Sequence, residues 1–399
     1  MNLQLSPEDL AFRDEVRAFL REHLTPEIVY RSRTEVHPPN EADRRWWNAV
    51  LNTRGWAAPS WPVQHGGPGW TPIQRHLFEM ECRLAGAPEL RWQGLRLIGP
   101  VICEFGSDAQ RKRYLPTILE GTEQWAQGFS EPGAGSDLAS LKTTALLAGD
   151  EYVVNGQKLW TTEGGDAELG FFLVRTDTTS KHGGISMLII DMKSPGVTVR
   201  PIEMINGDIS TYEVFLDNVR VPRENLIGEP GSAWTQTKFL LANERTSSAD
   251  IDKAWGDLRR IRASAARERK NGRPLLEDPA FARRLAQLEM EVEALDWSVL
   301  RVLCGAPSRR PVAAAASVLK IKGSSLQHQL GQLAVDALGP RSLRLYTREQ
   351  AFAAEPSALW PVDVPGARAD QLYMRACTIY GGAMEVQKNI IAKIAFGLA

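Results

Sequence analysis

The sequence predicts an α+β fold that is mainly helical. It should comprise an N-terminal helical domain (1–125), a middle β-barrel or sandwich domain (126–232) and a C-terminal four-helix bundle (233–399). Two observations predict this order. Hydrophobic residues recur at helical spacing before about residue 125 and after residue 234, and they alternate with polar residues in between. The composition also shifts near both boundaries. A chain of 399 residues is long enough to bury the cores of two or three domains.

In the N-terminal part, the first helix should begin after Ser6, because Pro7 suits a first turn and Asp9 completes a capping pattern. Val16 and Leu20 then recur at helical spacing. Further helices are expected near residues 40–54, 71–84, 89–105 and 108–120.

In the middle part, short alternating segments separated by turn residues predict strands near residues 127–129, 171–174, 185–190, 197–200 and 213–216. The run Tyr152–Thr162 also has strand character, and its Asn155-Gly156 pair predicts a hairpin turn. The C-terminal part should hold four long helical segments near residues 234–271, 277–304, 311–338 and 367–396.

Composition and charge are those of an ordinary globular protein, with 43% hydrophobic and 24% charged residues. A net charge of −1 gives no reason to expect nucleic acid or an anionic membrane as a partner. No uncharged apolar run reaches the roughly 18 residues of a membrane span, and the polar start is unlike a signal peptide. We expect a cytoplasmic protein without a metal site, whose scattered cysteines are buried thiols: Cys82, Cys103, Cys304 and Cys377.

The stretch Gln127–Asp137 is the strongest candidate for a binding site. A short strand ends at Phe129, and Pro-Gly-Ala-Gly after Glu131 forces a sharp turn. The hydroxyls of Ser130 and Ser136, together with free backbone N–H groups, would offer donors to a bound group. An ordinary hairpin turn is the alternative for this stretch taken alone.

Two motifs connect this stretch with a known family. Ser130–Asp137 matches "T/S-E-P-x-A-G-S-D", and Asn155–Thr162 matches "N-G-x-K-x-W-I-T" with Thr161 in place of isoleucine. Together they resemble the middle domain of the acyl-CoA dehydrogenase family, and the resemblance extends along the whole chain. It implies an FAD enzyme that desaturates an acyl-CoA thioester. A carboxylate removes the α proton while the β hydrogen leaves as hydride to flavin N5.

The resemblance also implies roles for single residues. Trp160 would pack on the isoalloxazine edge, and the Thr162 hydroxyl would reach N5. The remaining cofactor positions are Phe129, Ser130, Gly135, Ser136, Thr161 and Glu385, and the substrate-binding positions along the CoA chain are Ser136, Gly382 and Lys393. The alternatives are a core aromatic residue for Trp160, an ordinary strand threonine for Thr162, and solvated polar residues for Ser136 and Lys393.

The catalytic base is where this sequence departs from most of the family. The family's "I-Y-E-G-T" stands here as Ile379-Tyr-Gly-Gly-Ala, so Gly381 replaces the glutamate. A minority of the family carries the glutamate before an arginine on a C-terminal helix, which matches Glu244 and Arg245. We therefore predict Glu244 as the base, Arg245 as its positioning residue and the Gly381 N–H as a donor to the thioester carbonyl. A solvated Glu244, a simple surface cation at Arg245 and a weaker base candidate at Glu385 are the alternatives.

Two further departures concern the oligomer. The family's "R-x-Q-F-G-x-P" and "Q-x-x-G-G-x-G", which reach a neighbour's FAD, stand here as residues 268–274 and 336–342, with acids at Glu268 and Asp336. Arg267 or Arg269 could substitute for the arginine that Glu268 replaces. An acid near a pyrophosphate is repulsive. These departures resemble bacterial members that act on bulky CoA esters such as steroid side-chain thioesters. A homotetramer or dimer, or an α2β2 heterotetramer with a homologous subunit, is expected, with a flavoprotein as electron acceptor. An acyl-CoA oxidase, a redox-neutral enzyme and a non-catalytic subunit remain alternatives.

Overall fold

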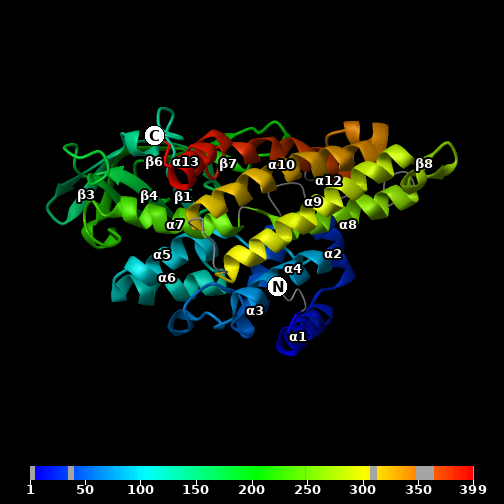
Figure 1. Ribbon diagram of the computed structural model, residues 1–399. Coiled ribbons are helices and arrows are strands. Elements are labelled where there is room, and N and C mark those ends of the chain that lie inside the picture. The colour runs from blue at the N-terminus through cyan, green and yellow to red at the C-terminus, as the bar shows by residue number, and fades with distance from the viewer. Residues whose placement is uncertain (1–4, 35–39, 248, 306–311, 347–363, 399) are drawn as a thin grey trace.

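The computed structural model describes residues 5–34, 40–247, 249–305, 312–346 and 364–398. Within these ranges the side chains of residues 33, 34, 241–247, 312 and 313 are not described. The early helices form one layer, the sheet lies at one end of the molecule, and the long C-terminal helices run away from the sheet above the early helices (Figure 1). This arrangement confirms the predicted fold class.

The N-terminal helices are α1 (Pro7–His23), α2 (Pro26–Thr34), α3 (Glu41–Thr53), α4 (Pro72–Ala85), the π-helix η2 (Gln93–Ile98), α5 (Gly99–Phe105) and α6 (Asp108–Glu120). As predicted, the Ser6 side chain caps α1 by accepting from the Asp9 N–H at 3.0 Å. The predicted start at residue 89 of one helix is wrong. Glu89 and Arg91 are held outside the helix by tertiary contacts, because the Glu89 carbonyl accepts from Arg44 and Arg91 pairs with Glu41.

The middle sheet has seven strands: β1 (Trp125–Gly128), β2 (Thr144–Ala148), β3 (Glu151–Thr162), β4 (Leu169–Arg175), β5 (Ile185–Asp191), β6 (Val197–Ile202) and β7 (Thr211–Pro222). Their order is β1-β4-β2-β3-β7-β6, with β5 paired to the other side of β4. Both faces of β4 are buried. Phe171 and Leu173 join the core of the N-terminal helices, whereas Phe172 and Val174 pack in the core of the sheet.

The predicted hairpin turn at Asn155-Gly156 is wrong. β3 passes straight through this pair with a shift in its pairing to β7, and the turn lies instead between β2 and β3, where Gly149 has φ +67°. Asn155 serves the bulge, since its Oδ1 accepts from the Asn218 N–H at 2.8 Å. Gly156 is required because a Cβ there would lie 2.4 Å from the Thr143 Oγ1.

The C-terminal part contains α7 (Ala233–Ser247), α8 (Ile251–Arg267), a hairpin of β8 (Arg269–Lys270) and β9 (Arg273–Pro274), α9 (Pro279–Leu303), α10 (Val312–Leu338), α12 (Val364–Tyr373) and α13 (Met384–Phe396). Helices α8, α9 and α10 share one hydrophobic core. A single helix over 234–271 is therefore wrong: the chain turns at Asp250, which has φ +46°, and the hairpin follows Arg267. The segment 367–396 is likewise interrupted, at Gly381 and Gly382.

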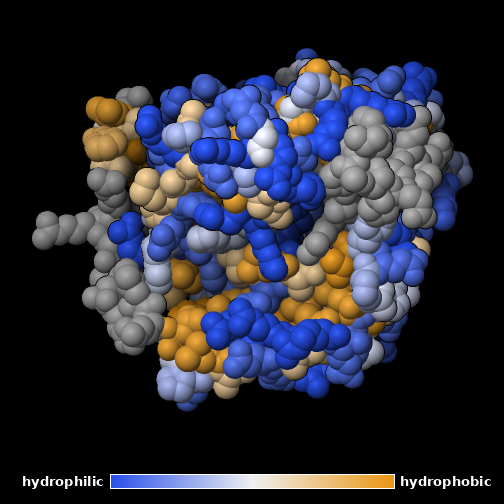
Figure 2. Space-filling model, turned by 90° about the vertical axis from the view of Figure 1, so that its right-hand side faces the viewer, coloured by the Kyte–Doolittle hydropathy of each residue, from blue (hydrophilic) through white to orange (hydrophobic). Residues whose placement is uncertain are grey.

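The surface gives two further results. Cys304 is exposed at the end of α9, so the expected burial of all four cysteines is wrong at this position. Seen from the far end of the bundle, hydrophilic residues cover much of the molecule, and hydrophobic residues show in patches (Figure 2). No helix of the described residues combines the length and apolar character that crossing a membrane requires.

Candidate active site

The two sequence motifs lie side by side in the structure. The Leu159 N–H donates to the Ser130 carbonyl at 2.9 Å. The Lys158 ammonium donates to Glu131 Oε1 at 2.8 Å and to the Phe129 carbonyl at 3.2 Å. Lys158 is fully buried, so this ion pair fixes the loop that follows β1 to strand β3. Neither Glu131 nor Lys158 was among the predicted site residues. The feature that could have predicted this ion pair is a lysine inside a strand pattern together with an acid in the neighbouring motif.

Glu131 and Lys158 respond to burial in different ways. Burial raises the pKa of the Glu131 carboxyl, but the Lys158 ammonium and donors from residues 142 and 143 outweigh it, and this pKa lies below its ordinary value of 4.5. Burial lowers the pKa of Lys158 to about 8, and the nearby Glu131 carboxylate offsets part of this lowering. The carboxylate is therefore better satisfied than the ammonium, and both are charged at neutral pH.

Strand β3 ends in a strained segment that presents an aromatic ring. Its pairing with β7 shifts between Lys158 and Thr161, and Trp160 adopts φ +60°. Trp160 is 54% exposed, which is unusual for tryptophan, whereas Thr161 is fully buried. The Thr161 Oγ1 has no hydrogen-bond partner among the described residues. Trp160 and the half-buried Thr162 are thus available to a ligand through their side chains, and Thr161 through its backbone.

The loop after β1 is open enough to receive a polar group. Glu131 and Ala134 exchange two backbone hydrogen bonds of 3.0 Å and close a tight turn. A Cβ added at Gly133 or Gly135 would meet no atom within 4 Å, and Ser136 is exposed beside them. The open loop and the exposed Trp160 ring are features that the flavin half of FAD would need.

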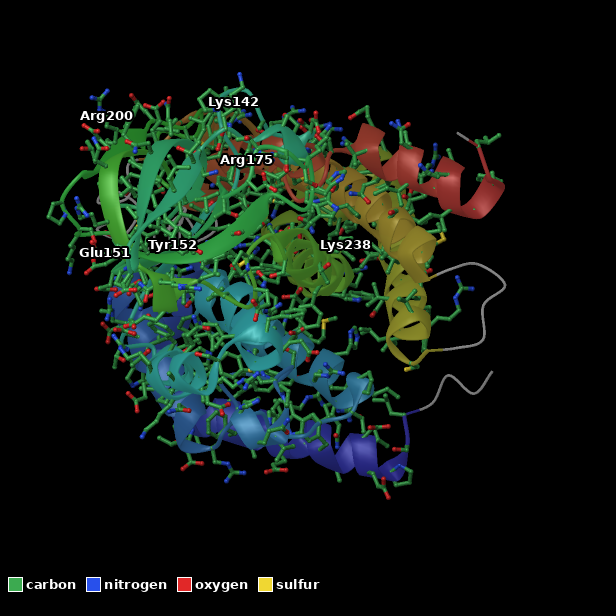
Figure 3. All side chains as sticks on the ribbon, turned by 90° about the vertical axis from the view of Figure 1, so that its left-hand side faces the viewer. Lys142, Glu151, Tyr152, Arg175, Arg200 and Lys238 are labelled. Atoms are coloured by element: carbon green, nitrogen blue, oxygen red, sulfur yellow. The ribbon has the colours of Figure 1, made fainter. Side chains whose placement is uncertain are left out.

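Helix α7 carries Glu244 and Arg245 between the two halves of the molecule. It packs against η2, α5, β5 and α10, with Leu240 fully buried and Phe105 and Phe239 in edge contact. Figure 3 shows Lys238 on this helix, between the sheet and the bundle. Glu244 and Arg245 lie in the last turns, where the structure describes the backbone and their side chains lie outside the described part.

The turn before α13 has a geometry suited to glycine. Gly381 and Gly382 have φ +62° and +92°. In the described part of the chain, no acceptor is found for the Gly381 N–H. The Gly382 carbonyl accepts from the buried Gln387 amide at 3.3 Å. An N–H without an acceptor among the described residues is the donor that a thioester carbonyl would need.

A charged cluster that the sequence analysis missed lies next to this turn. The nearly fully buried Lys320 places its ammonium 5.0 Å from the ring centroid of Tyr380. Asp250 lies in the same region, and burial first, then Asp252, raises the pKa of its carboxyl to about 6. The residues are far apart in sequence, and no pattern along the chain joins them.

The remaining predicted site residues are dispersed. Glu385 is exposed in the first turn of α13 and Lys393 in its last turn. Glu268 pairs with Arg341, and Asp336 pairs with Arg284 at 2.9 Å. These two acids are thus neutralised within the chain, whereas Arg269 and Arg273 are exposed on the hairpin of β8 and β9.

Comparison with known proteins gives three family matches in chain order. Residues 6–122, 126–219 and 231–396 match the N-terminal, middle and C-terminal domains of acyl-CoA dehydrogenase. Acyl-CoA dehydrogenase IpdE1 of Mycobacterium tuberculosis is 34% identical over 97% of both chains. Acyl-CoA dehydrogenase FadE26 of the same organism is 31% identical over 100% of this chain and 99% of its own.

Solved structures agree. The Tcur3481-Tcur3483 steroid ACAD superposes with a TM-score of 0.84 at 28% identity, and the ChsE4-ChsE5 complex from Mycobacterium tuberculosis with 0.82 at 29% identity, both over 100% of each chain. The glutaryl-coenzyme A dehydrogenase complex shares the fold at 22% identity. With its fold, its paired motifs and these matches, the chain belongs to the acyl-CoA dehydrogenase family and is an oxidoreductase of that kind.

Proposed function

We propose that this chain catalyses the FAD-dependent α,β-dehydrogenation of a bulky, branched or cyclic acyl-CoA, with Glu244 as the base. The observation that carries the proposal is which elements carry an acid and which do not. No carboxylate stands at residue 381, whereas α7, which packs against α10 as α13 does, carries Glu244 in its last turns. A base can serve from either wall of one pocket, provided that its oxygen reaches the α proton.

The chain's own residues would divide the work of the reaction. FAD, when bound, supplies the hydride-accepting chemistry. The Gly381 N–H would donate to the thioester carbonyl oxygen as negative charge builds there, and Glu244 would take the α proton. Trp160, Thr162, Phe129 and Ser130 would hold the flavin half of the cofactor. Glu385, with the backbone of Gly135 and Thr161, would complete that site, and Ser136, Gly382 and Lys393 would lie along the CoA chain.

The proposed substrate class rests on the relatives. The matched steroid ACAD is named for a steroid, and it and the ChsE4-ChsE5 complex are both named for pairs of chains. We propose that this chain likewise acts on a thioester with a large ring-bearing or branched acyl group, and that it assembles with copies of itself or with a homologous subunit. An electron-transferring flavoprotein would reoxidise it.

The test of the base is Glu244→Gln, with Glu293→Gln, an exposed glutamate on α9, as the matched control. We expect turnover of a bleaching acyl-CoA to fall by about 10²- to 10⁴-fold at unchanged flavin content, because a general base is lost. Glu293→Gln should match the wild type. Near-normal turnover of Glu244→Gln would remove the assignment, and a large loss in Glu385→Gln instead would move the role there.

A second candidate function is that of a non-catalytic subunit in a mixed tetramer. The internal ion pairs of Glu268 and Asp336 favour it, because they remove two contacts to a neighbour's FAD. The absorption spectrum of the purified chain separates the candidates. A yellow protein that an acyl-CoA bleaches anaerobically supports the first function, and rapid reoxidation in air would indicate an oxidase. A protein that stays colourless even when it is co-expressed with a homologue supports neither candidate function. A mixed assembly in which only the homologous subunit carries the catalytic base supports the second function.

A further inference from the structure

A buried ion cluster lies directly after the flavin-facing end of β3. Glu163 follows Thr162 and is 7% exposed. Its two carboxylate oxygens each have their own guanidinium: Oε1 accepts from Arg44 Nη1, and Oε2 lies 3.1 Å from Arg91 Nη1. The arginine side chains are 7% and 10% exposed, so the cluster is largely removed from water.

Other groups hold the two arginines in turn. The Arg44 Nε donates to the Glu89 carbonyl at 2.9 Å, and Arg91 donates to Glu41 Oε2 through Nε at 2.9 Å and Nη2 at 2.7 Å. Asp166 lies at 3.7 Å from Arg91. The cluster thus ties the end of a strand to α3 and to the segment before η2. These contacts also keep the Glu89–Arg91 stretch out of the expected helix.

The backbone at this place needs such support. Trp160 and Glu163 both adopt positive φ, at +60° and +57°, and the β3–β7 pairing is irregular between Lys158 and Thr161. Non-glycine residues in this conformation are strained and persist where surrounding contacts hold them. Thr162 lies between these two strained residues. The regular strand pairing therefore cannot by itself fix where Thr162 and Trp160 point.

The two arginines do not form a ligand pocket of their own. The cavity beside them, lined also by Trp125 and Gly94, has a volume of about 30 Å³. That space suits about one or two water molecules and is small for a phosphate or a carboxylate ligand. Their partner is Glu163 itself.

We propose that Arg44 and Arg91 are positioning residues for the flavin, acting through Glu163. By holding this carboxylate they fix the backbone on which the Thr162 hydroxyl and the Trp160 ring meet the flavin. The inference rests on the proposed function, since it assumes flavin at this end of β3. It adds that the N-terminal helices set the geometry of the redox centre through one ion cluster.

The charges of the cluster should also shift the reduction potential of the flavin, in a direction that depends on which charge is removed. Neutralising Glu163 leaves two guanidiniums with fewer negative charges near the flavin, which favours the electron-rich reduced form. Removing the Arg91 charge leaves the carboxylates in excess and disfavours it. Buried charges act over longer distances than exposed ones, because water screens them less.

The test compares Glu163→Gln and Arg91→Met with the wild type in the flavin-loaded protein, co-purified with its homologous subunit if flavin uptake needs one. The matched control is Glu151→Gln. Glu151 forms an exposed ion pair with Arg220 at 3.2 Å. It is the first residue of β3, at the end opposite Thr162, and is labelled in Figure 3. Flavin content, visible spectrum and midpoint potential in a dithionite titration are measured, together with kcat and KM for an acyl-CoA that bleaches the wild type.

We expect the midpoint potential to rise in Glu163→Gln and to fall in Arg91→Met. In both variants kcat should drop by about 10- to 100-fold with a smaller change in KM, because reacting groups are misplaced. Arg91→Lys keeps the charge, so its potential should stay close to the wild type while kcat falls, and it replaces Arg91→Met if that variant does not fold. Glu151→Gln should be unchanged.

Potentials that do not move, or that move in the same direction in Glu163→Gln and Arg91→Met, would overturn the inference. So would an unchanged spectrum together with a kcat loss no larger than that of Glu151→Gln. A wild type that binds no flavin in any assembly would overturn the proposed function instead. The two failures are thus distinguishable in one set of measurements.

Discussion

At the scale of single residues, the Lys158–Glu131 pair explains why the two motifs occur together. Each lies in one motif, and neither charge could be buried alone without a large cost in solvation. The carboxylate gains two backbone donors, at 2.6 Å from Lys142 and 2.9 Å from Thr143, in addition to the ammonium. The loop that presents Ser130 is therefore held by the strand that presents Trp160.

Glu131→Gln tests this role. The variant keeps the shape of the side chain but leaves the Lys158 ammonium buried without its counter-charge, so we expect a loss of about 3 to 5 kcal/mol in the free energy of unfolding. Glu151→Gln breaks an exposed pair and should cost less than about 1 kcal/mol. Urea unfolding at pH 7 measures both, and equal losses would show that the buried pair contributes nothing special.

The same pair gives a pH dependence with a defined sign. Because the folded pKa of Glu131 lies below 4.5, its stabilisation is complete above pH 4.5 and is lost as the pH falls through the folded value. Wild-type stability should therefore decrease more steeply on acidification below pH 4.5 than that of Glu131→Gln. Parallel acid limbs in the two proteins would contradict this assignment.

At the scale of elements, the sequence pattern predicted whether a segment is helix or strand better than it predicted where turns interrupt that segment. The strand character of Tyr152–Thr162 was correct, but Asn155-Gly156 was interpreted as a turn. In the structure the pair serves a bulge, because Asn155 bonds Asn218 across to β7 and Gly156 lies against Thr143. Both partners are distant in sequence, so local turn chemistry could not distinguish the two outcomes.

The helix breaks show the same limit. The segment 234–271 reads as one helix because Asp250 is an ordinary residue in a polar stretch, yet it adopts φ +46° and separates α7 from α8. Gln327 of α10 donates to the Asp250 carbonyl at 3.2 Å, which is a tertiary contact that the sequence does not reveal. The break ends α7 shortly after Glu244, the base of the proposed reaction.

The turn before α13 allows a matched prediction. Gly382 stands before α13 and Gly397 ends it, and both have positive φ, at +92° and +65°. An alanine at either position would have to adopt the same backbone conformation. Each should lose about 1 to 2 kcal/mol of stability from backbone strain. The Gly382 Cβ would also lie 2.2 Å from the buried Gln387 Nε2, whereas nothing lies within 4 Å at Gly397. Gly382→Ala should therefore lose at least twice as much in urea unfolding, and equal losses would rule out the close contact.

At the scale of the whole molecule, the fold and the family followed from the sequence because long motifs in a fixed order are specific. The two motifs also lie side by side, since the Leu159 N–H donates to the Ser130 carbonyl, and the flavin-binding roles of Ser130, Trp160 and Thr162 stay predictions. The ion cluster around Glu163 did not follow, since it joins α3, the segment before η2 and the end of β3. Charged residues on separate elements have no shared spacing in the chain.

The last prediction concerns how many flavins the assembly holds. Glu268 and Asp336 stand in segments that reach a neighbour's FAD in the family, and here each is paired within the chain, with Arg341 and Arg284. A neighbour's pyrophosphate would have to displace these pairs or meet uncompensated acids, and both cost free energy. We therefore expect an assembly with about half as many flavins as chains, formed with a homologous subunit that supplies the missing contacts. Native mass spectrometry combined with the flavin-to-protein absorbance ratio measures this number. One flavin per chain in an assembly of this chain alone would refute it, and would show that the ion pairs open on binding.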